Sequence, residues 1–441
     1  MKKAELFPLY KAAFIRYDGQ KEQVLAGDYS KHFLMTCDDV KDYVAQKLRY
    51  FETGAELECA EIGDGNINYV FKITDKKTGK SLVIKQADTK LRSSGRKLDV
   101  KRSKIEAEIL AIQNTLAPAM VPKVYCYDEA MCALCMEDIS AYKNLRTEML
   151  RGKTFPAFAD RISTFLADTL LPTADVAANT AAGRALKKER VRLFTNIELC
   201  DITEDLVLTE PYDDYKGRNV ITKGNEEFVQ KHLYRNEKLK AEVGMLRNAF
   251  MNNAQALIHG DLHSGSIFIN KNGIKVIDPE FAFYGPMGYD IGNVIGNMFF
   301  ALAYAVFAKP ERTEFIAWAE RTIADVADGS AQKLSEKYDA VVHFPLYNGL
   351  FKERYLAQIA SDSIGFAGTE IIRRVVGDAK VAELTSVTDM SVKIPMERAL
   401  IATGEKLIMS RAKKHTGSDL VRMFYEAAAT LLRRKNMSGR I

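Results

Sequence analysis

A short stretch near the middle of the chain, "IHGDLHSGSIF" at 258–268, combines several side chains that could do chemistry. His259, Asp261 and His263 alternate along it, so on an extended chain they would share one face. Three such side chains could bind a metal ion, as in a metallohydrolase. Alternatively, an Asp in an H-x-D loop accepts the proton of a substrate hydroxyl during phosphoryl transfer.

A second acidic group favours phosphoryl transfer. Asp278 follows Asp261 by 17 residues, at the end of the strand-like run "IKVI", and Glu280 comes two residues later. A kinase needs such an acid after a short hairpin, because it holds Mg²⁺ against the phosphates. The hydrolase interpretation lacks nearby ligands, since the other histidines are isolated in the sequence: His32, His232, His343 and His415.

Ser266 departs from the pattern expected of a phosphoryl-transfer loop. An Asn is expected five residues after Asp261, and the chain has Ser266 there. A hydroxyl is shorter than an Asn side chain and a poorer ligand for a hard cation than an amide carbonyl. We therefore expect Glu280, rather than Ser266, to supply the missing oxygen ligand.

Two features upstream fit a nucleotide site. "EIGDGNINYVFKI" places Gly63 and Gly65 between two strands, where backbone N–H groups could approach phosphates, although a plain hairpin has the same pattern. Lys85 follows in the apolar strand "SLVIKQA". It either extends to water at the strand end or contacts the α- and β-phosphates, with Glu106, or failing that Glu108, as its partner.

The elements that must position these groups divide the chain into two parts. Residues 58–140 predict about five strands and one helix, and that helix begins with Ser103 as N-cap and Glu106 in a capping box. Residues 1–55 and most of the chain after Ser140 have helical periodicity. The prediction is an α+β protein with a small sheet-rich part and a larger helical part.

Composition limits the kinds of partner. The 441 residues are 47% apolar and 27% charged with a net charge of +5, which gives no reason to expect nucleic acid. The apolar run "MFFALAYAVFA" at 298–308 is too short for a membrane span and predicts a buried helix. Six cysteines, including Cys132 and Cys135, are too few for a disulfide framework. Together with the lack of a signal-peptide pattern at the N-terminus, this predicts a cytoplasmic protein without membrane association.

The motifs taken together resemble a known family. "HGDLH" followed by "VIDPEF" resembles the aminoglycoside-phosphotransferase and choline-kinase branch of the protein-kinase-like fold. With "EIGDGNINYVFKI", "VIKQA", "MEDIS", "DPEFAFYGPMG" and "GFAGTEIIRRVVG", the chain is similar to the methylthioribose kinase family from about residue 60 to 377. The resemblance implies a bilobal α+β fold with a small lobe at 1–137, a helical lobe at 138–441, and ATP between them.

The same resemblance implies the reaction and the site. ATP and Mg²⁺ would be used to phosphorylate the 1-hydroxyl of S-methyl-5-thioribose in methionine salvage, by a homodimer. Asp261 would be the catalytic base, Lys85 the phosphate lysine, and Asn68 a nucleotide contact beside the glycines. The remaining matches are the adenine-reading hinge Glu137, Asp138 and Ile139, the metal segment Asp278, Pro279 and Glu280, and the substrate arginines Arg373 and Arg374.

Pattern and resemblance disagree about the arginine pair. "TEIIRRVVGD" alone predicts surface cations in the last turns of a helix that stops at Gly377. The resemblance instead places Arg373 and Arg374 at the transferring phosphoryl group. Two further interpretations stay open: a kinase of the same fold for an aminoglycoside, choline or homoserine, and an inactive binding module. The presence of Lys85, Asp261 and Asp278 together argues against the second.

Overall fold

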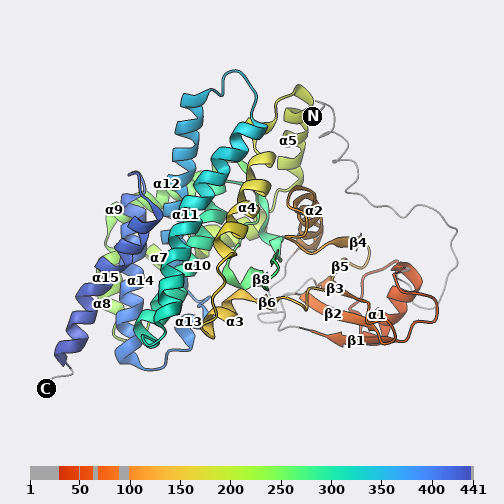
Figure 1. Ribbon diagram of the computed structural model, residues 1–441, viewed down its shortest axis with the longest axis horizontal. Coiled ribbons are helices and arrows are strands. Elements are labelled where there is room, and N and C mark those ends of the chain that lie inside the picture. Colours follow the sequence, from red (N-terminus) through yellow and green to blue (C-terminus); the bar gives the residue numbers. More distant parts are fainter. Residues whose placement is uncertain (1–28, 49, 63–67, 89–98, 439–441) are drawn as a thin grey trace. The chain divides into compact units, whose positions relative to one another are not determined.

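The computed structural model describes residues 29–48, 50–62, 68–88 and 99–438 (Figure 1). The chain divides into two compact units. Unit 1 is Met1–Tyr142 with Lys275–Glu280, and unit 2 is Lys143–Ile274 with Phe281–Ile441. The division into a small lobe at 1–137 and a helical lobe at 138–441 stays a prediction.

Unit 1 is built on a five-stranded antiparallel sheet in the order β1-β2-β3-β5-β4. The strands predicted for this part of the chain are confirmed. Its elements are α1 (Cys37–Tyr43), the π-helical turn Val44–Leu48, β1 (Leu57–Glu61), β2 (Asn68–Asp75), β3 (Ser81–Ala87), α2 (Lys101–Leu116), β4 (Val124–Asp128) and β5 (Ala133–Glu137). The helical prediction for 1–55 holds for residues 37–48, and residues 1–28 lie outside the described part.

Strand β3 is buried on both faces, and this explains how a lysine comes to lie inside unit 1. Side chains alternate along a strand, so Leu82 and Ile84 join the core cluster that contains Tyr43. Lys85 points the other way, toward α2. A charged group in that position requires a buried partner.

The capping box predicted for α2 is wrong. The helix begins at Lys101, and its N-cap Val100 makes no side-chain capping bond. The Asp99 carboxylate accepts a hydrogen bond from the Lys101 N–H at 2.9 Å, so the helix starts before Ser103. Ser103 and Glu106 are buried within it. Glu106 cannot return to the helix end, because its carboxylate pairs with a side chain of the sheet.

Unit 2 is mainly helical, and α4 and α11 run side by side in it (Figure 1). The fold class predicted from sequence, α+β, is confirmed. The helices are α3 (Leu145–Leu150), α4 (Phe158–Leu170), α5 (Ala181–Leu193), α6 (Ile197–Leu206), α7 (Glu210–Asp213), α8 (Glu226–Val229), α9 (Glu237–Asn252), α10 (Met287–Ala308), α11 (Thr313–Val341), α12 (Gly349–Val376), α13 (Ala382–Thr385), α14 (Met390–Ser410) and α15 (Gly417–Ser438).

Short strands frame the motifs of interest. They are β6 (Lys143–Asn144), β7 (Ala256–Ile258), β8 (Ile267–Ile269), β9 (Ile274–Val276) and β10 (Phe283–Gly285), and single helical turns cover Leu171–Thr173, Asp175–Ala177, Gln230–Tyr234, Ser264–Ser266 and Pro279–Phe281. β7 pairs with β10, and β6 pairs with β8. The "HGDLHSGS" loop therefore runs from the paired strand β7 to the paired strand β8.

Helix α10 is the buried centre of unit 2, as predicted for the apolar run at 298–308. It is longer than that run, with 22 residues, and is long and apolar enough to cross a membrane, but 83% of its most apolar window is buried inside the protein. The burial of this helix inside the protein identifies it as a core helix, although its length and composition would also suit a membrane span.

Close packing of α10 on α12 fixes the register of the arginine-bearing helix. A Cβ atom on Gly288 would lie 2.7 Å from the Ser363 nitrogen, and one on Gly292 would lie 2.6 Å from the Ser363 oxygen. Only glycine permits this approach. The glycines at 288, 292 and 296 thus hold the segment of α12 from Asp362 to Glu370, which directly precedes the two arginines, against α10.

Candidate active site

In unit 1, Lys85 bridges two acidic side chains. Its Nζ lies 2.8 Å from Glu106 Oε1, the partner expected first, and 2.6 Å from Asp278 Oδ1. Burial alone would lower the pKa of Lys85, but the Asp278 and Glu106 carboxylates raise it above its usual value. Burial raises the pKa of Glu106 despite the nearby ammonium. Lys85 therefore remains a cation and holds Asp278 in place.

Asp278 and Glu280 form an acidic pair with different surroundings. The Asp278 side chain is 46% exposed and its φ of +60° lies in the left-handed region, which non-glycine residues seldom adopt and which is common at functional sites. Glu280 is buried, with Asn68 Nδ2 at 3.4 Å and Arg102 Nε at 3.5 Å. Burial raises the pKa of Glu280, and Asp278 adds to the rise while Lys85 opposes it.

This donor set fits a Mg²⁺–nucleotide complex. Mg²⁺ prefers oxygen ligands and takes one or two carboxylates, with phosphate and water oxygens completing its octahedron. Among the described residues, no three His, Cys, Asp or Glu side chains are placed to hold a metal ion by themselves. Asp278 and Glu280 are the residues that could hold the metal jointly with phosphates.

The hinge candidates lie at the end of β5. The Asp138 carboxylate is engaged, with Lys72 Nζ at 2.8 Å and the Ser81 hydroxyl at 2.7 Å. Burial would raise its pKa, but these donors, with Ser140, lower it to about 2. Glu137 accepts from Lys275 Nζ at 2.8 Å. Both side chains are thus used in the structure. The Glu137 N–H donates to the Lys123 oxygen at 2.9 Å and the Ile139 oxygen accepts from the Tyr142 N–H at 2.8 Å, so the remaining backbone groups of Glu137–Ile139 are the ones that could read a base.

Gly63 and Gly65 lie outside the described residues. Asn68, the first residue of β2 after that turn, is buried and accepts from Arg102 Nη2 at 3.1 Å. Pro279 lies between the two metal-segment acids in a single helical turn.

In unit 2, the Asp261 loop is shaped by its own backbone and by one buried acid. Gly260 has φ +84°, and a Cβ there would lie 2.2 Å from the Phe281 oxygen. Asp290, in the first turn of α10, accepts from the His259 N–H at 2.7 Å and the Gly260 N–H at 3.0 Å. These bonds fix the backbone immediately before Asp261.

The Asp261 carboxylate faces two arginines. Its Oδ1 lies 3.1 Å from Arg373 Nη2 and 3.6 Å from Arg374 Nη2, and its Oδ2 lies 3.5 Å from His263 Nε2. Burial alone would raise the pKa of Asp261, but the imidazole and the two guanidinium groups hold it well below its usual range. Because burial lowers the pKa of His263 to about 4, the imidazole is neutral near pH 7, and the two guanidinium groups are then the cations that face the ionised carboxylate.

The pattern-based interpretation of Arg373 and Arg374 as surface charges is wrong. They are only 8% and 7% exposed. Both pair with Glu370, which is fully buried one turn earlier on α12. Glu370 also accepts from Asn297 Nδ2 of α10 at 3.0 Å. Glu370 therefore fixes the positions of both arginines, and their guanidinium groups also reach Asp261.

The two histidines do not form a metal site with Asp261. Burial lowers the pKa of His263 to about 4, and its Nδ1 accepts from the Ser266 N–H at 3.0 Å. His259 is fully buried, and its Nδ1 accepts from the Asp261 N–H at 3.3 Å. Both rings are used to hold the loop, so the arrangement gives the metallohydrolase interpretation no support.

Ser266 also serves the loop. Its side chain is buried, and its hydroxyl donates to the Asp261 backbone oxygen at 3.2 Å. A hydroxyl already bonded in this way is a poor candidate for a metal ligand.

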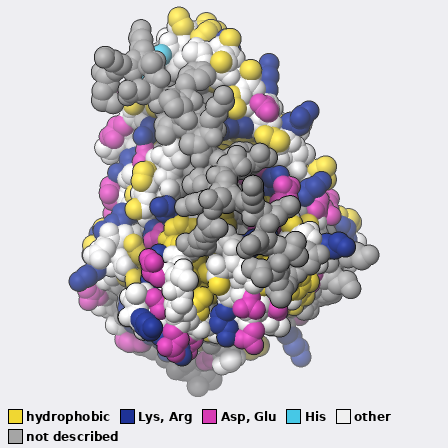
Figure 2. All heavy atoms as spheres, turned by 90° about the vertical axis from the view of Figure 1, so that its right-hand side faces the viewer, with side chains coloured by type: hydrophobic (Ala, Val, Ile, Leu, Met, Phe, Trp, Pro, Cys, Tyr) yellow, Lys and Arg dark blue, Asp and Glu magenta, His cyan; other side chains and the backbone are white. Residues whose placement is uncertain are grey.

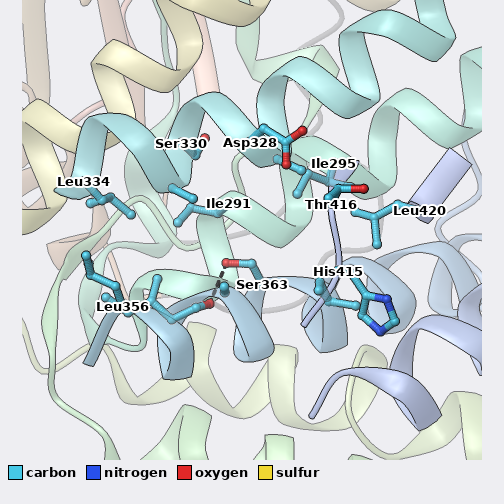
Figure 3. A pocket seen from close by; sticks show the side chains of 15 residues that line it. Ile291, Ile295, Asp328, Ser330, Leu334, Leu356, Ser363, His415, Thr416 and Leu420 are labelled. Carbon is cyan, nitrogen blue, oxygen red and sulfur yellow. Dashed lines mark hydrogen bonds between the residues drawn. The ribbon is translucent and has the colours of Figure 1, made fainter. Parts of the chain in front are cut away.

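A cavity elsewhere in unit 2 does not carry this chemistry. Figure 3 shows it among α10, α11, α12 and the start of α15, with Ile291, Ile295, Leu334 and Leu420 on its wall. At about 100° per helical residue, Ile291 and Ile295 lie on a different side of α10 from Asn297. Its one labelled carboxylate, Asp328, already accepts from the Gly417 N–H at 2.8 Å.

Several residues of these clusters were missed from sequence. Asp290, Asn297 and Glu370 support the Asp261 loop and the arginines, and Arg102 supports Glu280. The sequence did contain one indication for unit 2. The glycines spaced by four in "MGYDIGNVIGN" indicate that this helix packs closely on another helix. The polar residues between the glycines could then be expected to face that neighbouring helix. Arg102 gave no such signal, since it lies in a basic polar stretch.

The surface adds no second candidate on the face drawn in Figure 2. Acidic and basic side chains are interspersed there over the described residues, so no single-sign patch marks a polyanion surface on that face.

Comparison with known proteins follows the same motifs. Residues 58–321 match the phosphotransferase enzyme family. Methylthioribose kinase of Bacillus pumilus is 35% identical over 87% of this chain and 95% of its own length. Those of Geobacillus thermodenitrificans and Erwinia tasmaniensis are 36% and 34% identical, covering 87% and 86% of this chain and 94% and 95% of their own lengths.

Proposed function

Because the chain belongs to the phosphotransferase enzyme family and, within it, to the methylthioribose kinases, we propose that it phosphorylates the 1-hydroxyl of S-methyl-5-thioribose with ATP. The product is S-methyl-5-thioribose 1-phosphate, an intermediate of methionine salvage. The chain is an ATP-using kinase by its family, and the choice of acceptor and the roles of individual residues are the proposal.

The observation that carries the proposal is the contact of Asp261 with Arg373 and Arg374, at 3.1 and 3.6 Å. A carboxylate that accepts a hydrogen bond from the sugar hydroxyl directs its oxygen at the γ-phosphorus. The arginines beside it stabilise the charge spread over the transferring group. A cation-lined site is poorly suited to choline or an aminoglycoside, since both are cations.

The low pKa of Asp261 defines its role as a base. A carboxylate held this acidic takes a proton poorly from a free hydroxyl, whose own pKa is far higher. In a loose phosphoryl-transfer transition state the hydroxyl becomes acidic only late. Asp261 therefore orients the hydroxyl first and accepts its proton as the new O–P bond forms and the bond from the γ-phosphorus to the leaving ADP oxygen breaks.

In unit 1, we assign Lys85 to the α- and β-phosphates, Asn68 to the nucleotide, and Asp278 with Glu280 to Mg²⁺. When bound between these carboxylates and the phosphates, the metal would supply positive charge that neutralises the phosphate oxygens. Glu106 keeps Lys85 in place, and Arg102 with Asn68 keeps Glu280 in place. The backbone of Glu137–Ile139 is assigned to the adenine.

An ADP-release assay over a panel of acceptors tests the proposal. Methylthioribose should give the highest kcat/KM, ahead of ribose, with choline and an aminoglycoside inactive. Homoserine is the informative rival, because its carboxylate could pair with the arginines. Preferred turnover of homoserine or of a cationic acceptor would replace the substrate assignment and leave the kinase assignment intact. The homodimer and the cytoplasmic location stay predictions, and sedimentation of the purified protein tests the first.

A further inference from the structure

Within the described residues of unit 2, three buried polar side chains have no hydrogen-bond partner: Tyr212, Asn293 and Glu383. Both carboxylate oxygens of Glu383, and both amide atoms of Asn293, are unpaired. Each of these last two residues is only 1% exposed. Nearly all buried polar groups in proteins are hydrogen-bonded, and a buried carboxylate left without donors is among the costliest exceptions. Such groups often mark a position where a ligand supplies the partner.

Glu383 lies in the same charged cluster as Asp261. Its Oε2 is 3.7 Å from Arg146 Nε, too far for a hydrogen bond. That nitrogen donates instead to the Ser264 hydroxyl at 3.0 Å, and Arg146 Nη2 donates to Asn297 Oδ1 at 2.6 Å. Ser264 belongs to the Asp261 loop, so one arginine connects Glu383 to the loop that carries the proposed catalytic base.

Electrostatics support the same placement. Burial raises the pKa of Glu383, while Arg146, the backbone N–H of Glu383 itself and Arg374 oppose the rise. Arg374 is also the residue whose Nη2 lies 3.6 Å from Asp261. Arg374 thus acts on both carboxylates, and Glu383 is the one to which no other described residue donates a hydrogen bond.

The acceptor carries donors of the kind that Glu383 lacks. A ribose ring bears neighbouring 2- and 3-hydroxyl groups besides the 1-hydroxyl that reacts. Hydroxyl donors to a carboxylate make short, strong hydrogen bonds, and two adjacent hydroxyls can engage both of its oxygens. Arg146, with a side chain 16% exposed, borders Glu383 and is the more accessible of the two.

We propose that Glu383 is a specificity residue that accepts hydrogen bonds from the 2- and 3-hydroxyls of the sugar while Asp261 engages the 1-hydroxyl. This inference rests on the proposed function and extends it from the reacting hydroxyl to the rest of the ring. It identifies the acceptor class as a furanose with a free 2,3-diol, whatever its 5-substituent.

A double-change cycle, in which the enzyme side chain and the substrate hydroxyls are removed separately and together, tests the proposal. Glu383→Gln and the unchanged enzyme are each assayed with methylthioribose and with its 2,3-dideoxy analogue. The unchanged enzyme should lose at least about 100-fold in kcat/KM on the analogue, because a site built for hydroxyls rejects a substrate without them. Glu383→Gln should lose a comparable factor on methylthioribose and little more on the analogue. Losses that simply multiply would overturn the contact and leave Glu383 a structural residue.

Two further variants separate recognition from folding. Glu397 is another buried glutamate of unit 2, 1% exposed, but Thr222 and Asn225 donate to its two oxygens at 2.8 Å each. Glu397→Gln should lower the melting temperature and leave the preference for the diol unchanged. Glu383→Asp keeps the charge on a shorter side chain and should raise KM while retaining discrimination. If Glu397→Gln abolished discrimination equally, the effect would be one of stability and the proposal would fail.

The unchanged enzyme separates this inference from the proposed function. If it fails to phosphorylate methylthioribose but turns over another pentose, the substrate assignment fails, and the cycle with that pentose and its dideoxy form still decides the role of Glu383. If it prefers an acceptor without a diol, such as homoserine, the inference fails as well.

Discussion

Burial opposes the ionisation of Glu106 and Glu280 in one charged cluster and of Asp261 and Glu370 in the other, yet the pKa values of the two pairs shift in opposite directions. In unit 1, three carboxylates (Glu106, Asp278 and Glu280) surround two cations (Lys85 and Arg102), and the pKa values of Glu106 and Glu280 are raised. In unit 2, burial also opposes ionisation, yet the pKa values of Asp261 and Glu370 are lowered. Burial is common to both clusters, so the number and position of the cations decide the sign.

This difference matches two tasks of a kinase. A cluster with an excess of carboxylates gains from a divalent cation, which supplies the charge it lacks. A cluster in which permanent cations hold the carboxylates ionised can meet a developing phosphate charge and still present an acceptor for a proton. Asp278 is therefore suited to hold a metal and Asp261 to hold a hydroxyl, although both are aspartates that follow a short strand.

The comparison predicts that the largest loss comes from Asp261→Asn. The amide keeps the shape of the side chain but cannot accept the proton, so we expect kcat to fall by about 10³-fold or more, within the range of general-base effects. Nucleotide binding, assigned to unit 1, should change little. Steady-state ADP release and calorimetric titration with ADP measure the two quantities. Weakened nucleotide affinity with preserved chemistry would show that the roles of the two clusters have been exchanged.

Glu280→Gln should have the next largest effect. The amide removes one negative charge from a cluster that needs a metal, so the Mg²⁺ concentration for half-maximal activity should rise, with a loss of about 100-fold in kcat/KM for ATP. Ser266→Asn is the matched comparison and should be tolerated better, because Ser266 Oγ bonds the loop backbone. The opposite ranking would mean that the metal shell includes position 266.

The fold was largely predictable because its elements follow local rules. Short β-type stretches separated by turn residues predicted β1, β2 and β3, and the long apolar run predicted the burial of α10. The start of α2 was missed, since Ser103 and Glu106 satisfy a local capping pattern that a tertiary contact overrides. Local patterns cannot show that a glutamate is needed elsewhere in the fold.

The charged clusters were predictable only where a motif recorded them. Asp261 and Asp278 belong to recognisable sequence motifs, whereas Arg373 and Arg374 have the pattern of an ordinary helix end. Whether such cations face water or the core depends on the glycine contacts between α10 and α12, which are set by residues far away in the chain. No sequence pattern marked Glu383, because a carboxylate is left unpaired by the absence of donors among its neighbours in the fold, and the sequence does not show those neighbours.

Removing either arginine of the Asp261 cluster should have a moderate effect on the rate. Arg373→Ala and Arg374→Ala should each cost at least about 2 kcal/mol in transition-state stabilisation if the guanidinium meets the phosphoryl group. The loss should appear in kcat, with KM for ATP little changed. Matched control variants are Arg151→Ala, whose side chain is 63% exposed and pairs with Glu148, and Arg422→Ala, whose side chain is 66% exposed. Rates of the arginine variants equal to those of the controls would contradict the assignment.

The smallest predicted effect is a change in the pH profile of kcat/KM. It tests directly whether the arginines cause the difference in carboxylate pKa between the two clusters. Asp261 must be ionised to accept the proton, and His263 together with the two arginines holds its pKa below the usual range, so the unchanged enzyme should show no loss from Asp261 between about pH 5 and 8. In Arg374→Gln one cation is gone and the pKa of Asp261 rises toward its usual value. The residual activity should then decline at a higher pH as acid is added.

The pH profile of kcat/KM for the sugar, measured at saturating Mg²⁺ and ATP, checks this prediction. Glu280→Gln provides the comparison, because its charge lies in the other cluster. An acid limb that moves in Glu280→Gln but not in Arg374→Gln would show that the arginines do not set the ionisation of Asp261.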